Sequence, residues 1–150
     1  MKGIKVKIKK LADNAVIPAY AKPGDAGLDL TATSMTFDKQ GNVVYGTGIA
    51  VEIPAGYVGL LFPRSSISKY DQVLTNCVGV VDSGYRGEIT LKFKPLGRFG
   101  GKPDYEPQAY EVGERIGQLI VMPYPPVTFV ECAELEGSER GEGGYGSTGK

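Results

Sequence analysis

The chain has 150 residues, which is enough for one domain that buries roughly 70% of the surface of its unfolded chain. Its 17 Lys and Arg residues balance its 17 Asp and Glu residues, so no net charge favours nucleic acid or a membrane as a partner. The chain has no apolar run of about 18 residues that could span a membrane, and no apolar stretch follows the lysines near Met1 as in a signal peptide. We therefore expect a cytoplasmic protein that binds neither nucleic acid nor membrane.

Glycine and proline are frequent, with 22 and 10 residues, and they divide the chain into short segments. Between these turns, short alternations of apolar and polar residues and short apolar runs predict β-strands. The predicted strands cover residues 4–8, 26–30, 48–54, 57–62, 78–81, 88–94, 115–123 and 127–133, and a surface loop covers 95–109. No segment has a helical period longer than two turns. The sequence therefore predicts an all-β fold, a jelly-roll-like distorted barrel or sandwich with one short helix near Ser65.

The residue types available limit the chemistry. The chain has no histidine, so a general base must be a carboxylate, a lysine or a tyrosine. Cys77 and Cys132 are far apart in sequence and have no histidine with which to complete a zinc site. We expect both cysteines to be buried free thiols in a reducing compartment.

The most informative stretch covers residues 76–89. An apolar run ends at Asp82, and Gly84 and Gly87 then bracket two residues before the alternation resumes. This pattern predicts a β-hairpin whose two glycines adopt positive φ. Asp82 is a candidate general base at the end of a buried strand. The alternative, an aspartate that accepts hydrogen bonds from its own turn, is about equally supported by the pattern alone.

Polar residues interrupt three other apolar segments. Asp29 stands between two leucines and needs a partner, either a specific group or nearby backbone and water. Arg64, Ser65 and Ser66 follow a buried strand, where a serine could cap the helix or all three could bind an anion such as phosphate. Gln118 needs a hydrogen-bond partner if it faces inward.

The C-terminal residues 138–150 are rich in glycine, a composition usual for a disordered tail. They also carry Arg140, Tyr145, Ser147 and Thr148. An arginine for a terminal phosphate, an aromatic ring for a base and hydroxyl groups together resemble a lid. Stacking of such a ring on a base contributes on the order of 1–3 kcal/mol.

Five separated stretches, in order, resemble the motifs of the homotrimeric dUTP pyrophosphatases (dUTPases). They are residues 25–30, 63–66, 79–88, 115–119 and 140–149. The resemblance runs from about residue 4 to the C-terminus. It implies a catalytic β-barrel domain over residues 1–137, a glycine-rich arm over 138–150 that closes over an active site, and a homotrimer whose sites are shared between subunits.

The resemblance also implies a reaction, the hydrolysis of dUTP to dUMP and pyrophosphate, which limits uracil in DNA and supplies dUMP for dTMP synthesis. Asp82 would activate the water that attacks the α-phosphorus. The residues implied for the base and sugar are Asn76, Gly79, Val80, Val81, Tyr85 and Tyr145, and those for the phosphates are Arg64, Ser65, Ser66, Gln118, Arg140, Gly146 and Ser147. Mg²⁺ would be held mainly by triphosphate oxygens and waters, with Asp29 touching it only through water.

The sequence departs from the family pattern at Tyr145, where phenylalanine is usual, at Gly117, where alanine is common, and at Ser66, where glycine is common. Two alternatives remain to be weighed. One is the related dCTP deaminase branch, which would use a catalytic glutamate such as Glu88. The other is a catalytically silent trimer that binds nucleotide and signals to a protein partner.

Overall fold

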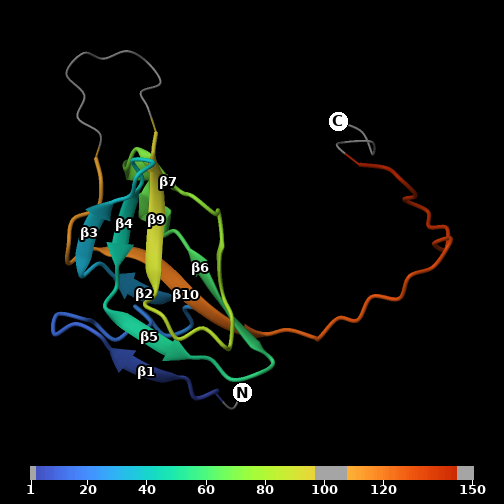
Figure 1. Ribbon diagram of the computed structural model, residues 1–150, viewed down its shortest axis with the longest axis horizontal. Helices are drawn as coiled ribbons and strands as arrows, with labels where there is room; N and C mark the ends of the chain where they lie inside the picture. The colour runs from blue at the N-terminus through green and yellow to red at the C-terminus, as the bar shows by residue number, and fades with distance from the viewer. Residues whose placement is uncertain (1–2, 97–107, 145–150) are drawn as a thin grey trace.

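The computed structural model describes residues 3–96 and 108–144, and in these ranges the chain is nearly all β, as predicted (Figure 1). The strands are β1 (Lys7–Lys10), β2 (Leu28–Thr31), β3 (Ser34–Phe37), β4 (Val43–Gly46), β5 (Ile49–Glu52), β6 (Tyr57–Phe62), β7 (Gln72–Leu74), β8 (Gly79–Val81), β9 (Thr90–Pro95) and β10 (Arg115–Pro123). The one helix of these ranges is the short 3₁₀ helix η1 (Ser65–Lys69), at its predicted place. None of the described helical structure is long and apolar enough to cross a membrane.

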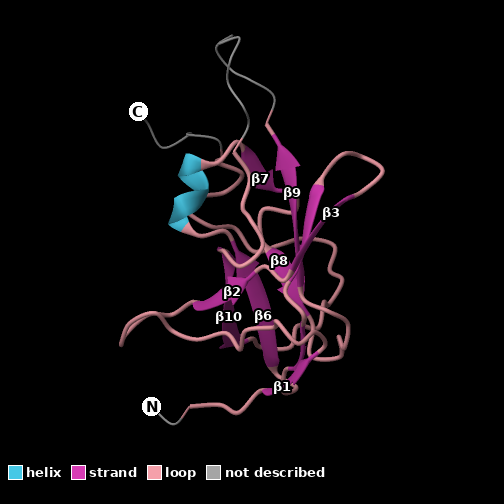
Figure 2. Cartoon of the chain, turned by 90° about the vertical axis from the view of Figure 1, so that its left-hand side faces the viewer, coloured by secondary structure: helices cyan, strands magenta, loops and turns pink. Residues whose placement is uncertain are grey.

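The strands form two four-stranded antiparallel sheets and a small two-stranded one. The first large sheet has the order β2-β10-β6-β8, the second has the order β3-β4-β9-β7, and β1 pairs with β5. Side chains from all three sheets meet in a single core, which makes the fold a jelly-roll-like sandwich (Figure 2). Short strands are enough to build this fold because each sheet buries one of its faces against the same apolar core.

The alternation read from the sequence matches the burial of β9 but not that of the first predicted strand, 4–8, since β1 covers Lys7–Lys10 and all four of its residues are exposed. Leu91 and Phe93 of β9 are buried, whereas Lys92 and Lys94 are exposed. The predicted strands 57–62 and 115–123 coincide with β6 and β10. Where apolar and polar residues clearly alternate, neighbouring residues are enough to predict a strand, because alternate side chains of a strand point to opposite faces of the sheet.

An aromatic cluster fills the centre of the second large sheet. The ring of Tyr45 meets that of Phe93 edge-on at 5.7 Å and that of Tyr110 at 6.2 Å. The Tyr45 hydroxyl donates a hydrogen bond to the Tyr110 carbonyl oxygen at 2.9 Å. Burial raises the pKa of the Tyr45 hydroxyl above its usual value, so this group stays a neutral donor inside the core.

The predicted β-hairpin over residues 76–89 is wrong. β8 pairs with β6 in the first large sheet, whereas β9 pairs with β4 and β7 in the second. Residues 82–89 therefore cross from one sheet to the other, and they are too many for the two-residue loop of a tight hairpin. Gly84 and Gly87 do not adopt the positive φ that a hairpin turn was expected to require.

The predicted strand over residues 127–133 is also wrong. In the described part of the chain β10 ends at Pro123, and residues 124–144 run away from the sheets in an extended path without strand pairing (Figure 1). Val127, Phe129, Val130 and Leu135 are exposed along it. A strand is stable only beside another strand edge, and after Tyr124, whose N–H donates to the Gly56 carbonyl oxygen, the segment pairs with no strand among the described residues. We call residues 124–144 the extended segment.

The cysteines are free, as expected, but both are exposed rather than buried. Cys77 lies in the turn before β8 with a positive φ of 59°, and Cys132 lies on the extended segment. Neither position faces the core, since a turn and an unpaired segment have no buried face. Most of the predicted loop 95–109 lies outside the described residues.

Replacing Phe93 by alanine should lower the free energy of unfolding by about 3–5 kcal/mol, because the ring is fully buried in the aromatic cluster. Chemical denaturation at a fixed protein concentration measures the effect. The matched control is Phe37→Ala on the edge strand β3, where the ring is 66% exposed and the expected loss is below about 1 kcal/mol. Equal losses in the two variants would contradict the placement of the core.

Candidate active site

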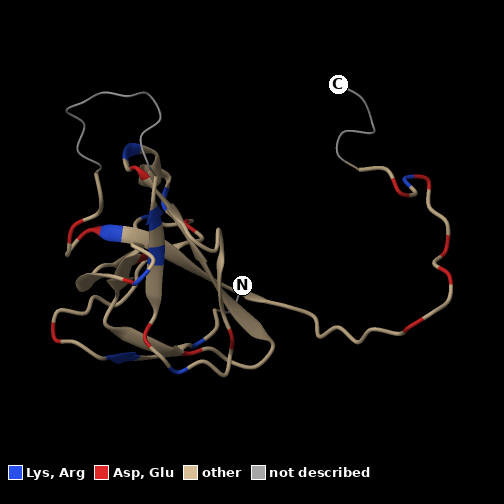
Figure 3. Ribbon diagram, turned by 45° about the horizontal axis from the view of Figure 1, so that its top comes forward, with Lys and Arg blue, Asp and Glu red and all other residues tan. Residues whose placement is uncertain are grey.

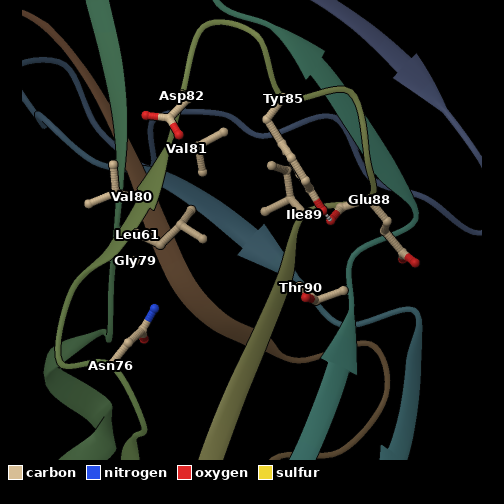
Figure 4. Close-up of a pocket in the computed structure, with 10 residues that line it drawn as sticks. All are labelled: Leu61, Asn76, Gly79, Val80, Val81, Asp82, Tyr85, Glu88, Ile89 and Thr90. Atoms are coloured by element: carbon tan, nitrogen blue, oxygen red, sulfur yellow. Dashed lines mark hydrogen bonds between the residues drawn. The ribbon is translucent and has the colours of Figure 1, made fainter.

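A cavity of about 170 Å³ lies where the connection 82–89 leaves β8 and enters β9 (Figure 4). Six predicted site residues line it: Asn76, Gly79, Val80, Val81, Asp82 and Tyr85. Leu61, Glu88, Ile89 and Thr90 complete the wall. The structure thus brings together every described residue that was predicted to bind the nucleobase and the sugar. Asp82, the predicted general base, lies in the same place. We call it the Asp82 cavity.

The turn that carries Asp82 and Tyr85 is held by its own chain. The Tyr85 N–H donates to the Asp82 carbonyl oxygen at 3.0 Å, which closes the turn. Arg86 Nη1 donates to the carbonyl oxygens of Ser83 at 2.7 Å and Tyr85 at 2.9 Å. These contacts fix the relative positions of the Asp82 carboxylate and the Tyr85 ring without any glycine at positive φ.

Gly87 has a different purpose from the one predicted. The Tyr85 hydroxyl donates to the Glu88 carbonyl oxygen at 3.0 Å, which lays the ring across Gly87. A Cβ at Gly87 would lie 2.6 Å from ring carbon Cζ of Tyr85 and would overlap the hydroxyl. Glycine is therefore required here by the close approach of the ring rather than by backbone conformation.

The Asp82 carboxylate is exposed, and within the described ranges no backbone N–H of its own turn donates to it. This disfavours the alternative of an aspartate whose only purpose is to stabilise its turn. Glu88 differs, because its Oε1 accepts a hydrogen bond from the Gly48 N–H at 2.7 Å. In Figure 4 the Glu88 carboxylate points away from Asp82 and Asn76. Glu88 thus joins two segments of the core edge, while Asp82 keeps its oxygens for a ligand or water.

A second cavity, of about 310 Å³, lies over β2, β10 and the end of β6. Its walls include Asp25, Asp29, Arg64, Ser65 and Gln118. The strand register explains this grouping, since Asp29 is paired with Gln118 and Gln118 with Phe62, two residues before Arg64. We call it the Arg64 cavity.

Asp29 was expected to need a partner because it lies in an apolar strand, and its partners are two arginines. Its Oδ1 accepts from Arg64 Nε at 2.9 Å and its Oδ2 from Arg115 Nη1 at 2.8 Å, and its side chain is only 16% exposed. Because Asp29 engages Nε, Arg64 keeps both Nη groups for a ligand. One carboxylate thereby orients the guanidinium group that was predicted to bind phosphate.

Gln118 also has the partner that was expected, since its Nε2 donates to the Pro63 carbonyl oxygen at 3.1 Å. Gly27 makes room for it: a Cβ at Gly27 would lie 2.9 Å from Gln118 Cδ and would overlap Oε1. This packing fixes the amide at the floor of the Arg64 cavity.

The predicted serine cap of the helix is not formed. Arg64 occupies the cap position without a side-chain hydrogen bond, and Ser65 and Ser66 lie inside η1. Ser65 is exposed and lines the Arg64 cavity. Ser66 is half-buried, with its Oγ 3.3 Å from the Tyr110 hydroxyl. Of the two alternatives for this segment, the anion site therefore remains.

The two cavities lie far apart in one chain. Val81 of β8 is paired with Gly59 of β6, so Asp82 stands beside Val58, six residues before Arg64 along an extended segment. At 3.3 Å per residue the two positions are about 20 Å apart. The two cavities share no lining residue, so one chain holds two separate parts of the predicted site.

The remaining predicted residues belong to the C-terminal region. Arg140 lies on the extended segment, where its Nε donates to the Gly143 carbonyl oxygen at 3.0 Å. In the view of Figure 1 this segment runs away from the sheets that carry both cavities. Tyr145, Gly146 and Ser147 lie outside the described residues.

Two residues gained a role that sequence reasoning did not assign. Arg115 belongs to a recognised motif, but only the pairing of β10 with β2 brings its guanidinium group to Asp29. Tyr110 follows a loop, and only the fold buries it against η1. Neither position carries a local signal, because both contacts join residues far apart in sequence.

Within the described ranges, no group of three or more acidic or sulfur side chains converges as a metal cage. The donors nearest to the Arg64 cavity are the carboxylates of Asp25 and Asp29. Hard oxygen donors of this kind suit Mg²⁺, which keeps several waters and needs few protein ligands when phosphates are present. The residues present fit a cation held mostly by a ligand.

A family model described as dUTPase matches residues 13–149. The chain is 40% identical over 149 residues to the deoxyuridine 5'-triphosphate nucleotidohydrolase of Streptomyces coelicolor, covering 98% of this chain and 78% of that relative. It is 39% identical to the enzyme of the same name from Gloeobacter violaceus, with 99% of both chains covered.

Solved structures agree with these relatives. A mutant dUTPase of Staphylococcus bacteriophage 80alpha with dUpNHpp superposes with a TM-score of 0.80 at 31% identity, covering 97% of this chain and 99% of that one. A mutant dUTPase of phage phi11 of S. aureus, described for its coordination of a structural Mg(II) ion, has a TM-score of 0.72 at 25% identity, covering 89% of this chain and 100% of that one. With matches along nearly its whole length in sequence and in fold, the chain belongs to the dUTPase family.

Proposed function

We propose that the protein is a dUTP diphosphatase that hydrolyses dUTP to dUMP and pyrophosphate. The Asp82 cavity is the observation that carries the proposal: a candidate base, a ring for the sugar and an amide for a nucleobase line one small space. The reaction would limit uracil in DNA and supply dUMP for dTMP synthesis. A cytoplasmic location is part of the same proposal.

The chemical step uses water as the nucleophile. The Asp82 carboxylate accepts a proton from that water, the water oxygen forms a bond to the α-phosphorus, and the bond from the α-phosphorus to the bridging oxygen breaks. The electron pair leaves with pyrophosphate. Orientation of the water and stabilisation of charge would supply most of the rate.

Selection of the nucleotide belongs to the Asp82 cavity. The Asn76 amide and the backbone from Gly79 to Val81 read the uracil edge, and the place of β8 at the edge of its sheet leaves one side of that backbone without a strand partner among the described residues. The Tyr85 ring packs on the deoxyribose and leaves no space for a ribose 2′-hydroxyl. Its bond to the Glu88 carbonyl and its position over Gly87 support a fixed ring of this kind.

The Arg64 cavity would hold the phosphates through Arg64, Ser65, Ser66 and Gln118, with Arg140, Gly146 and Ser147 of the arm 138–150 closing over them and Tyr145 stacking on the base. Mg²⁺ would be held mainly by triphosphate oxygens and waters, with Asp29 reached through water, and would neutralise phosphate charge. The bond from Asp29 to Arg64 supports this assignment, because it aims the guanidinium group.

The separation of the two cavities supports a homotrimer with shared sites. Since one chain keeps Asp82 and Arg64 about 20 Å apart, a second copy would bring the two parts of a triphosphate site together. The extended segment supports association as well. It exposes Phe129, Val130 and Leu135 together with a series of glutamates, a surface that a lone chain leaves uncovered (Figure 3).

The direct test is pyrophosphate release with Mg²⁺ from dUTP, dTTP, dCTP and UTP in parallel. We expect turnover of dUTP alone. Equal turnover of all four would contradict the roles of Asn76 and Tyr85. Binding of dUTP without turnover would favour the silent nucleotide-binding trimer, and ammonia from dCTP would favour the deaminase alternative.

Asp82→Asn should lower kcat about 100-fold or more, because an amide cannot accept the proton of the attacking water. Binding of dUTP, measured by calorimetry, should be nearly unchanged, since the side chain keeps its shape. A loss of binding in step with the rate would show that Asp82 is structural.

The same variant tests shared sites. Asp82→Asn and Arg64→Ala subunits, each inactive alone, should regain about a quarter of wild-type activity when refolded together in equal amounts, because each intact residue comes from half of the subunits. Mixed protein that stays inactive would place both residues in a site within one chain.

Gly87→Ala should raise KM for dUTP about tenfold and weaken discrimination against UTP, because the new Cβ displaces the Tyr85 ring. The matched control is Gly84→Ala in the same connection, where a Cβ meets nothing within 4 Å and φ is not positive. Steady-state kinetics on both substrates measure the effect. Equal changes in the two variants would refute the sugar role of Tyr85.

A further inference from the structure

Tyr110 connects the core to the phosphate motif. It is 2% exposed and lies between the undescribed residues 97–107 and β10. Its ring packs on Tyr70, which follows η1, with a centroid distance of 4.0 Å, and on Phe93 of β9 at 5.8 Å. The ring therefore joins η1 to the aromatic cluster.

The two polar groups of Tyr110 have different partners. Its carbonyl oxygen accepts the hydrogen bond from Tyr45, deep in the core. Its hydroxyl lies 3.3 Å from Ser66 Oγ, and within the described ranges this is its hydrogen-bond partner. A contact of 3.3 Å is long for two hydroxyl groups, and such contacts at ligand-free sites often shorten when the ligand binds.

The direction of this hydrogen bond follows from the ligand that Ser66 was predicted to bind. Phosphate oxygens only accept hydrogen bonds, so a serine that binds phosphate must donate its single hydroxyl proton to the phosphate. Ser66 Oγ then has only acceptor positions left for Tyr110. The Tyr110 hydroxyl therefore donates a hydrogen bond to Ser66 Oγ, and Ser66 Oγ donates one to the phosphate.

We propose that Tyr110 is a positioning residue for the triphosphate, whose hydroxyl holds Ser66 Oγ in the orientation from which it donates to a phosphate oxygen. This inference rests on the proposed function. It adds a buried residue outside the recognised motifs to the phosphate-binding apparatus.

The electrostatic surroundings suit a permanent donor. Burial raises the pKa of the Tyr110 hydroxyl, and the opposing effects of the Ser66 hydrogen bond and the Arg64 charge are smaller. The group therefore keeps its proton at neutral pH.

The simpler alternative is a core tyrosine whose hydroxyl merely needs a partner. That alternative predicts that loss of the hydroxyl lowers stability and leaves substrate affinity alone. Tyr45 provides the comparison within the same cluster, because its hydroxyl is also buried and bonded but does not touch η1.

The test compares wild type, Tyr110→Phe, Ser66→Ala and the double variant. KM and kcat are measured on dUTP, and affinity for inorganic pyrophosphate by calorimetry. We expect each single variant to raise KM and weaken pyrophosphate binding about three- to tenfold, with kcat nearly unchanged. The double variant should lose no more than Ser66→Ala, because both substitutions break one chain of hydrogen bonds.

Tyr45→Phe is the control, and it should lower the thermal midpoint while keeping wild-type KM. The proposal is overturned if Tyr110→Phe keeps wild-type KM and pyrophosphate affinity, whatever its thermal midpoint, or if the losses of the two variants add. Wild-type affinity in Ser66→Ala also overturns the proposal, because Tyr110 then has no phosphate donor to position.

The kinetic and calorimetric measurements separate this inference from the proposed function. A wild type that binds pyrophosphate but does not turn over dUTP refutes the proposed function, and the pyrophosphate affinities of the variants still decide the role of Tyr110. A wild type that does neither overturns both.

Discussion

The two strands beside Asp82 must bury their inner faces in one core while belonging to different sheets, and the candidate site depends on this constraint. β8 is an edge strand of the first large sheet and β9 lies inside the second. The connection 82–89 has to cross between them, so it cannot fold back as a tight hairpin. Its side chains consequently face the opening between the sheets, where Asp82 and Tyr85 line a cavity. The geometry of the candidate site thus results from how the sandwich is closed.

The Arg64 cavity has a different physical basis, the charged side chain of Asp29 within an apolar strand. Asp29 would be costly in an apolar strand without partners, and the two arginines that satisfy it come from the end of β6 and the start of β10. The same ion pairs that make Asp29 tolerable also orient Arg64. The orientation of Arg64 and the stability of the strand are linked at this point, since removal of either charge would leave the other partly buried and unpaired.

The separation of the two cavities is a constraint of the sheet itself. Register between β6 and β8 is set by the buried alternation of both strands, and a slip would turn their apolar faces outward. The distance between Asp82 and Arg64 is therefore rigid within one chain. A second copy can supply the missing part, and the exposed apolar residues of the extended segment give such a copy a surface to cover.

Local pattern determined much of this protein from sequence alone. Short apolar runs after turn residues defined β6 and β10 to the residue, and five motifs identified the family, because these signals reside in neighbouring residues. Strand pairing, the burial of Tyr110 and the contact of Arg115 with Asp29 were decided only by tertiary structure. The predictions of a hairpin, of a strand over 127–133 and of buried cysteines were wrong for the same reason. Each depends on which distant segments meet in the fold, and local sequence does not contain this information. A residue's sequence neighbours determine which way its side chain points, but only the assembled sheets determine what it meets there.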